Sequence, residues 1–391
     1  MARVSNVAIR TPQRASRQFW ARTFGWELAL LAAVLVALIG GTRAYLIAGG
    51  IVVLTLLLGV PIKGRSLLDW AQVGLTFLRR RRRQIDNPAD MPVDLVPLAQ
   101  WVPGLSVNQT RSAQGNEVGV VTDGRSWTGV LALSSDDVLV ADSGHKIDLD
   151  ALSGLTRQDD IVFAGLQMVT YTVPAPVTPL LPQGSPAGLA YAEVAGADAP
   201  PAVRMTWLCV RLDPRLCLEA VARRGASTDG IYATLRFGMH RVQAALKRQG
   251  IVTRALTPLE IYDVLSLTSG STPDHDEERS SEGWRTWNCD GLAHSGRHVR
   301  SWGSNRSIGY QSLLQVLNTA PVLFAVTSFT LDAASRATGA VRLVAPTAEM
   351  AVAAGAHVAA ALPRSVRLSY AGGAQVPTVL ATVPLGRQAR R

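Results

Sequence analysis

Two uncharged apolar runs near the start of the chain constrain its fold more than any other feature. Residues 28–41 and 45–60 form these runs, and only three residues separate them. Helices on both sides of so short a connection must turn back on each other. With short extensions to 24–41 and 45–62, each run spans about 27 Å at about 1.5 Å per residue, close to a hydrocarbon core of about 30 Å. The pattern predicts a transmembrane hairpin over residues 24–62; a buried hairpin of a soluble core and a signal peptide are the alternatives.

Positive charge is gathered around this predicted hairpin. Residues 1–83 hold 13 Lys and Arg against two acidic residues, whereas residues 84–391 hold 26 basic against 27 acidic residues. The connection between the two runs carries only Arg43. Because basic flanks stay on the cytoplasmic side of a membrane, we expect a multi-pass membrane protein. Its basic N-terminus, residues 1–23, and its large C-terminal region would both be cytoplasmic, and this nearly neutral region lacks the basic surface that nucleic acids require.

Residues 63–83 follow the hairpin and predict an amphipathic, arginine-rich helix. Apolar residues recur at helical spacing, and polar residues occupy the opposite face. The helix ends in a run of five basic side chains, Arg79, Arg80, Arg81, Arg82 and Arg83. These arginines are candidates for contacts with anionic lipid headgroups at the membrane surface. The alternative is a helix packed on a partner subunit, with its arginines in solvent.

The rest of the chain predicts a linker followed by one folded region. Pro and Asp are frequent over residues 84–114, which we expect to lead into a cytoplasmic domain over residues 115–391. Asp123-Gly124 stands between two β-type runs and predicts a hairpin with both turn residues at positive φ. Strands and helices then alternate, which favours an α/β or α+β fold with a mixed central sheet. A proline-rich stretch, residues 174–203, predicts a surface loop.

The alternation of elements contains a hint of repetition. The pattern predicts a helix over residues 228–248 and another that starts at Thr257-Pro258. A strand, helix, strand order occurs twice, over residues 204–256 and over residues 340–370. A weak internal duplication is one interpretation, although two such units also arise by chance.

One group of metal-type residues occurs in the chain. Cys289, His294 and His298 lie close together in the sequence, with Asp290 beside the cysteine. Zinc requires three or four ligands that converge within about 2.0 to 2.3 Å. In a strand, Cys289 and His294 point to opposite faces unless Asp290-Gly291 bends the chain. We therefore interpret these residues as polar positions of an edge strand, and we expect neither a metal nor another cofactor.

No catalytic constellation stands out from the sequence. The chain contains no Gly-x-x-x-x-Gly-Lys-[Ser/Thr] phosphate loop, no Gly-x-Ser-x-Gly and no His-Glu-x-x-His. Asp148 and Asp150 form an Asp-x-Asp pattern, which in nucleotide-sugar transferases helps to bind a divalent cation through carboxylate oxygens. Because this pattern is short and unspecific, we interpret Asp150 as a helix cap and expect no enzyme.

The layout of the whole chain resembles the EccE family of type VII (ESX) secretion systems in mycobacteria and their relatives. The resemblance rests on the basic N-terminus, the paired apolar runs, the arginine-rich helix and two late segments, RTWNCDGLAHSGRHVRSW and SVRLSYAGG. It implies a subunit of an inner-membrane secretion complex with EccB, EccC and EccD as partners, without catalytic residues of its own. Among the paralogues, the chain is most similar to those of the ESX-five system.

Three hypotheses for function follow. The first is a structural subunit that supports assembly and stability of the secretion complex. The second is a membrane-tethered, glycosyltransferase-like enzyme, which rests only on the alternating elements and on Asp148 and Asp150. The third is an adaptor that recruits cytosolic partners through the proline-rich loop.

Overall fold

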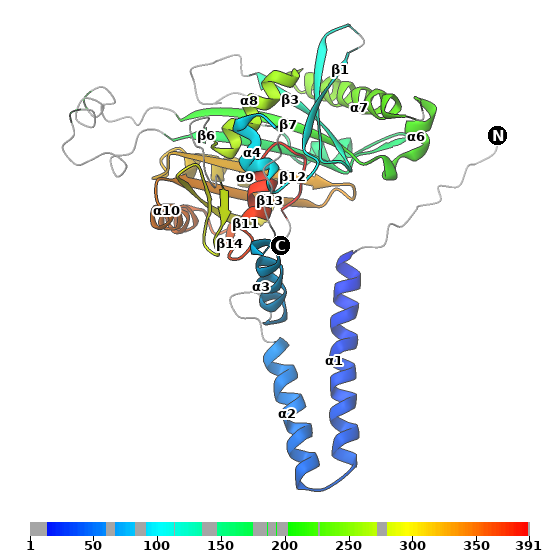
Figure 1. Cartoon of the computed structure of the whole chain (residues 1–391), viewed down its shortest axis with the longest axis vertical. Helices are drawn as coiled ribbons and strands as arrows, with labels where there is room; N and C mark the ends of the chain where they lie inside the picture. The colour runs from blue at the N-terminus through cyan, green and yellow to red at the C-terminus, as the bar shows by residue number, and fades with distance from the viewer. Residues whose placement is uncertain are drawn as a thin grey trace. The chain divides into compact units, whose positions relative to one another are not determined.

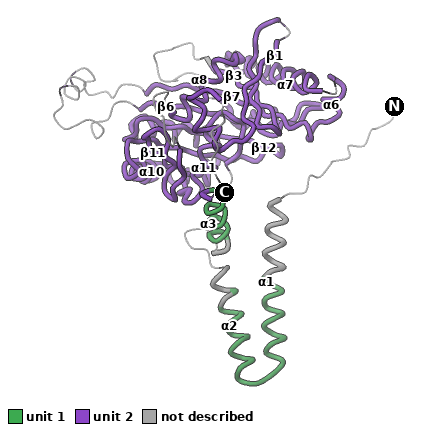
Figure 2. Tube along the Cα trace, viewed as in Figure 1, with its two compact units in different colours: residues 1–80 green, residues 81–391 purple. Residues whose placement is uncertain are grey.

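The chain divides into two compact units, residues 1–80 and residues 81–391 (Figure 2). The structure is a computed structural model. It describes residues 14–59, 67–82, 91–112, 114–134, 147–174, 186, 193, 202–225, 227–271 and 280–389. The boundary between the units falls inside the predicted arginine-rich helix. Most of the proline-rich stretch 174–203 and most of the polar stretch after residue 271 lie outside the described residues.

The first unit contains a pair of helices, α1 (Arg14–Leu38) and α2 (Thr42–Gly59), followed by α3 (Leu67–Arg81) (Figure 1). Gly40 and Gly41 connect the pair at φ values of 76° and 90°, which only glycine adopts readily. Small buried residues lie where the two helices face each other: Ala33, Ala44 and Ala48. The predicted helical pair therefore forms, with the chain reversing in the short connection.

The expectation that this pair is a transmembrane hairpin is wrong. Within the described residues, no helix is both long enough and apolar enough to span a membrane. The uncharged part of α1 runs only from Leu28 to Leu38, about 17 Å at 1.5 Å per residue, because basic and acidic residues occupy its first half. That is well short of a hydrocarbon core of about 30 Å.

The second unit is built on a single large antiparallel sheet (Figure 1). All of its pairings among the described residues are antiparallel. The expected mixed sheet is therefore wrong, because the alternating elements join by hairpins and by returns to earlier strands, and not by parallel crossovers. Across the sheet, the strands lie in the order β1 (Ser106–Arg111), β2 (Glu117–Thr122), β3 (Trp127–Ser134), β7 (Val203–Leu212), β6 (Gly165–Val173), β12 (Phe324–Asp332), β13 (Ala337–Ala345), β11 (Leu292–Trp302), β10 (Trp287–Cys289) and β9 (Ser280–Glu282).

Two short strands complete the sheet at branch points. β8 (Val252–Ala255) pairs with the end of β3, and β14 (Val366–Tyr370) pairs with the end of β11. A separate two-stranded ladder joins β4 (Arg157–Gln158) to β5 (Ile161–Val162). Short helical segments connect the elements: η1 (Val93–Leu95), α4 (Val96–Ala99), η2 (Ala151–Leu155), η4 (Pro214–Leu216) and α6 (Leu218–Arg223).

Helices cover both faces of the sheet, so it has a hydrophobic core on each side. On one side, here called the α7 face, α7 (Thr228–Arg248), α9 (Arg306–Leu317) and α10 (Ala348–Ala361) pack over one core. On the other side, the α8 face, α8 (Pro258–Ser269), α11 (Gln375–Thr382) and α4 pack over a second core. The apolar residues of each central strand alternate between the two cores.

Local signals explain where the best-predicted helices begin and end. α7 has the bounds that its sequence predicts; the Ser227 hydroxyl accepts a hydrogen bond from the N–H of Asp229, and Gly250 follows the helix at a φ of 79°. α8 begins with a capping box in which Thr257 and Glu260 satisfy each other's backbone N–H groups. The Asp123-Gly124 hairpin between β2 and β3 is also present, but only Gly124 has a positive φ.

The structure differs from the sequence prediction most clearly at the predicted linker. Residues 84–114 include α4 and β1, and Leu95, Leu98 and Val102 are almost completely buried. The prolines there serve to start short helices, because Pro97 stands in the first turn of α4. Residues 91–112 are therefore part of the folded unit, and their prolines do not mark a linker.

Gly119 of β2 provides a test of how closely α8 packs on the sheet. A Cβ at this position would lie 2.6 Å from Cδ1 of Ile261 and 2.9 Å from the backbone nitrogen of Pro258. Gly119→Ala should lower the free energy of unfolding by about 1–3 kcal/mol through overpacking, as measured by urea denaturation. Gly154→Ala is the control, since a Cβ there meets nothing within 4 Å. Equal stability of the two variants would contradict the close packing of α8.

Candidate functional site

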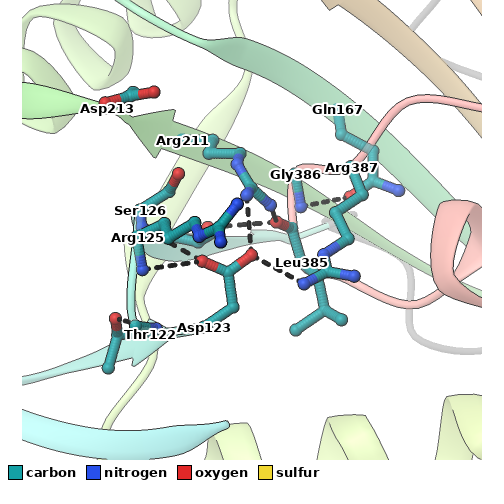
Figure 3. A network of polar contacts seen from close by, with 12 residues as sticks. Thr122, Asp123, Arg125, Ser126, Gln167, Arg211, Asp213, Leu385, Gly386 and Arg387 are labelled. Atoms are coloured by element: carbon teal, nitrogen blue, oxygen red, sulfur yellow. Dashed lines mark hydrogen bonds and ion pairs between the residues drawn. The ribbon is translucent and has the colours of Figure 1, made fainter. Parts of the chain in front are cut away.

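A buried ion-pair network joins the β2–β3 turn to the segment that follows α11 (Figure 3). Asp123 lies in the turn, Arg211 near the end of β7, and Arg387 in the segment after α11. One Nη2 atom of each arginine lies 2.7 Å from Oδ2 of Asp123. The Asp123 side chain is only 9% exposed, so the carboxylate is largely shielded from solvent. We call these three residues the Asp123 network.

The local sequence explains why Asp123 can accept two arginines. Its Oδ1 accepts hydrogen bonds from the backbone N–H groups of Ser126, at 3.0 Å, and Arg125, at 3.3 Å. This is the turn geometry that Asp favours when Gly follows it. Oδ1 is thus engaged by the turn itself, and Oδ2 remains for the guanidinium groups of Arg211 and Arg387.

Burial and the two arginines have opposite effects on the pKa of Asp123. Burial by itself raises the pKa of the carboxyl group, because it disfavours the charged form. The positive charges of Arg211 and Arg387, with the hydrogen bonds that they donate, outweigh burial and lower the pKa of Asp123 from 3.8 to about 2. The carboxylate is therefore ionised throughout the physiological range.

The backbone after α11 is held at the same place. The Leu385 carbonyl accepts hydrogen bonds from Nη1 of Arg211, at 2.9 Å, and from the hydroxyl of Thr128, at 3.1 Å. Gly386 has a φ of 64°, and a Cβ there would lie 2.6 Å from Cβ of Arg211. Only glycine fits so close to the arginine in this conformation.

Gln167 on β6 completes this attachment with both ends of its amide. Its Nε2 donates to the carbonyls of Ala381, at 2.7 Å, and Val383, at 3.2 Å. Its Oε1 accepts from the N–H of Gly386 at 2.7 Å. A single buried side chain therefore satisfies three backbone groups at the end of α11 and beyond it, which a buried chain segment requires.

A second buried cation lies on the α8 face of β13. Arg342 is completely buried, and its guanidinium donates to the carbonyl oxygens of Thr268 and Ser269, the last two residues of α8. Its Nη1 also lies 3.1 Å from Nδ1 of His294 on β11. These partners are two helix-end carbonyls and an imidazole, and none is a carboxylate. We call this arrangement the Arg342 site.

Burial controls the protonation of the Arg342 site. It lowers the pKa of Arg342 to about 10, which still leaves the guanidinium charged at neutral pH. It also lowers the pKa of His294, and the positive charge of Arg342 lowers it further. The imidazole is therefore neutral and accepts the hydrogen bond at Nδ1. The carbonyls at the end of α8 carry the negative end of the helix dipole, so they compensate the cation.

The metal-type residues lie on β10 and β11, and β11 pairs with a strand on each side, so the interpretation as an edge strand is wrong. Asp290 and Gly291, at φ values of 43° and 78°, form the turn between β10 and β11. His294 faces the Arg342 cation, which is an unfavourable neighbour for a second cation. Among the described residues, no group of three or more His, Cys, Asp or Glu could hold a metal ion.

The other candidate residues also have local partners. Asp148 accepts hydrogen bonds from the N–H groups of Asp150 and Ala151 at the start of η2. Asp148, and not the predicted Asp150, therefore caps this segment. Asp150 lies 3.3 Å from Nη1 of Arg306 in an ion pair.

The predicted membrane-surface arginines lie at the end of α3. Arg79, Arg81 and Arg82 are exposed, Arg80 is half-buried, and Arg83 lies outside the described residues. The three exposed side chains are therefore accessible for a contact with an anionic surface.

Sequence analysis missed the three arginines that organise the second unit. Arg211 and Arg342 stand inside apolar strands, and such an interruption is the signal that could have drawn attention to them. Arg387 has no local signal, because its partner Asp123 is 264 residues away.

Comparison with known proteins relates one part of the chain to a protein family. Residues 200–297 match the family model described as "Putative type VII ESX secretion system translocon, EccE". The chain is also 26% identical over 221 residues to the ESX-1 secretion system protein EccE1 of Mycobacterium tuberculosis, in strains CDC 1551 / Oshkosh and ATCC 25618 / H37Rv. Over these residues the chain is similar to the EccE family. The alignment covers 55% of this chain and 43% of EccE1, so the chain spans less than half the length of the curated relatives it matches.

The family match can be located in the fold. Residues 200–297 run from the start of β7 through α7, β8 and α8 to the middle of β11. They include Arg211 of the Asp123 network and His294 of the Arg342 site. The match therefore contains Arg211 and the end of α8, whereas Asp123, Arg387 and Arg342 lie outside it. The ESX-five assignment remains a prediction.

The low pKa of Asp123 predicts how the free energy of unfolding depends on pH. Asp123→Asn should lower the free energy of unfolding by about 2 kcal/mol at pH 7, because the pKa lies about two units below its ordinary value and each unit corresponds to about 1.4 kcal/mol. A lowered pKa contributes stability above the unfolded-state value of 3.8, and this contribution is lost as the pH falls through about 2. Urea denaturation at pH 7, 4 and 2.5 should show the difference between the two proteins shrinking with acid.

The matched control for this prediction is Asp263→Asn, which replaces an exposed carboxylate of α8. It should change the free energy of unfolding by less than about 0.5 kcal/mol. A stability difference for Asp123→Asn that stays constant between pH 7 and pH 2.5 would show that the ion pairs are not its cause.

Proposed function

We propose that the chain is a structural subunit of a type VII secretion complex and supports its assembly and stability. The observation that carries this proposal is the EccE family match over residues 200–297. The relative EccE1 is named as a protein of the ESX-1 secretion system, which supports a place for this chain in a related machine.

The chemistry of the buried polar groups is consistent with a structural role. Arg211, Arg342 and Gln167 donate to backbone carbonyls and thereby fix the ends of two helices. Groups used in this way are committed to holding chain segments in place. We therefore propose that the second unit presents a rigid surface to other subunits.

Partners and location follow from the same family argument. We propose that the chain associates with the membrane complex that contains EccB, EccC and EccD. The first unit offers a means of association, because large apolar side chains of α1 and α2 are exposed: Leu28, Leu31, Val34, Leu35, Leu38, Tyr45, Leu46, Ile47 and Val53. Exposed apolar patches of this kind commonly mark surfaces that other molecules cover.

Affinity purification tests the proposal. The tagged chain, expressed at native level and extracted in mild detergent, should co-purify with EccB, EccC and EccD in one large assembly. A chain that lacks residues 1–80 should recover at least ten-fold less of these partners, because it has lost the exposed apolar surfaces of the first unit. Recovery of the tagged full-length chain without EccB, EccC and EccD would contradict the proposed function.

The exposed arginines of α3 support a further part of this proposal, a contact with anionic lipids. Each basic residue near an anionic surface contributes about 1 kcal/mol. Replacement of Arg79, Arg81 and Arg82 by Gln should therefore weaken binding of the full chain to phosphatidylglycerol vesicles by about 100-fold, as measured by flotation. The loss should fall as salt rises, because salt screens the contact.

A matched triple variant controls for net charge. Arg111, Arg248 and Arg364 are exposed on the second unit, and their replacement by Gln removes the same charge. Vesicle binding of this control should stay within about three-fold of the unchanged chain. An equal loss in both variants would indicate a general charge effect and would contradict a lipid contact at α3.

A further inference from the structure

Counted inward from its two edges, the large sheet shows the same pattern of strand connections. From one edge it runs β1, β2, β3, β7, β6, and from the other edge it runs β9, β10, β11, β13, β12. In each series a hairpin is followed by a second hairpin whose later strand pairs with the first hairpin, as β7 does with β3 and β13 with β11. A short strand then returns to the same partner, β8 to β3 and β14 to β11.

The two series meet at a symmetric centre. β6 and β12 both contain nine residues and pair antiparallel. Val169, the middle residue of β6, is opposite Ser328, the middle residue of β12. An antiparallel pair with matched midpoints is the arrangement that a two-fold axis through this point produces.

Two pairs of helices, α7 with α10 and α8 with α11, follow the same symmetry. α7 and α10 follow the second hairpin of each series, and both pack on the α7 face. α8 and α11 follow the returning strand, and both pack on the α8 face. Because equivalent helices lie on the same face, the pseudo-two-fold axis runs perpendicular to the sheet and not within its plane.

From this order we infer that the second unit is an internal duplication. Each half binds the end of the last helix of the other half, and we call these reciprocal contacts the exchange. We define half 1 as residues 106–269 and half 2 as residues 280–389. The end of α8, in half 1, is bound by Arg342 of half 2. The segment after α11, in half 2, is bound by Arg211, Gln167 and Thr128 of half 1.

This exchange makes each half depend on the other for buried hydrogen bonds. Without half 2, the carbonyls of Thr268 and Ser269 would lose the guanidinium that satisfies them. Without half 1, the Leu385 carbonyl would lose both of its donors. Because an unsatisfied buried polar group is costly, the unit behaves as a two-fold dimer whose protomers are joined in one chain. The inference concerns the organisation of the fold and does not rest on the proposed function.

Cleavage between the halves tests the inference in the full chain. A protease recognition sequence inserted within residues 272–279 allows the purified protein to be cut after folding. The two fragments should co-elute in size-exclusion chromatography and should unfold in one thermal transition. Separation of the fragments under native conditions, or two independent transitions, would overturn the inference.

Variants distinguish the exchanged contacts from general stability. In the cut protein, Arg342→Met should weaken association of the fragments by at least ten-fold, as measured by dilution. Gln167→Ala removes three hydrogen bonds of the opposite exchange and should have an effect of similar size, so it decides the question if Arg342→Met fails to fold. Thr257→Ala removes the cap of α8 within half 1 and should leave fragment affinity within two-fold. A loss of affinity from Thr257→Ala as large as that from Gln167→Ala would contradict the exchange.

Discussion

The contact of buried arginines with helix-end carbonyls is the interaction on which the second unit depends. A charged group in a core needs compensation, and Arg342 receives it from the last carbonyls of α8. Arg204, which is half-buried, makes a similar contact near the end of α9, where it donates to the Leu314 carbonyl and to Asn318. The planar guanidinium suits this task, because it donates several hydrogen bonds at fixed angles and remains charged when buried. Lysine carries its three N–H donors on one nitrogen and lacks this planar, separated arrangement of donors.

These contacts matter because the sheet itself is assembled from distant parts of the chain. The hairpins β2–β3 and β12–β13 form between neighbours in sequence, but β3 with β7 and β6 with β12 join segments far apart. Loop closure makes such pairs costly to form first. Two helix-covered cores then bury both faces, and the arginines fix where each helix ends. The position of α8 and α11 is thus set by polar contacts as well as by apolar burial.

The sequence predicts features that depend on neighbouring residues better than features that depend on distant residues. α7, α8 and the Asp123 hairpin depend on caps, turn residues and periodicity within about 20 residues, and the sequence predicts all three. Strand direction depends on which distant strands pair, so the mixed sheet is wrong. The partners of Asp123 come from β7 and from beyond α11, and no local pattern contains them. The paired apolar runs predict helices correctly, since periodicity reports helix formation, but an uncharged stretch of limited length does not establish a membrane span.

The family match includes residues from both halves of the second unit. Residues 200–297 begin in half 1 and end in half 2, so the matched segment crosses the junction between the halves. It contains α8, whose end reaches Arg342, and Arg211, which reaches the segment after α11. The matched segment therefore contains residues of both halves, and it holds one partner of each exchanged contact: the end of α8, which Arg342 binds, and Arg211, which binds the Leu385 carbonyl.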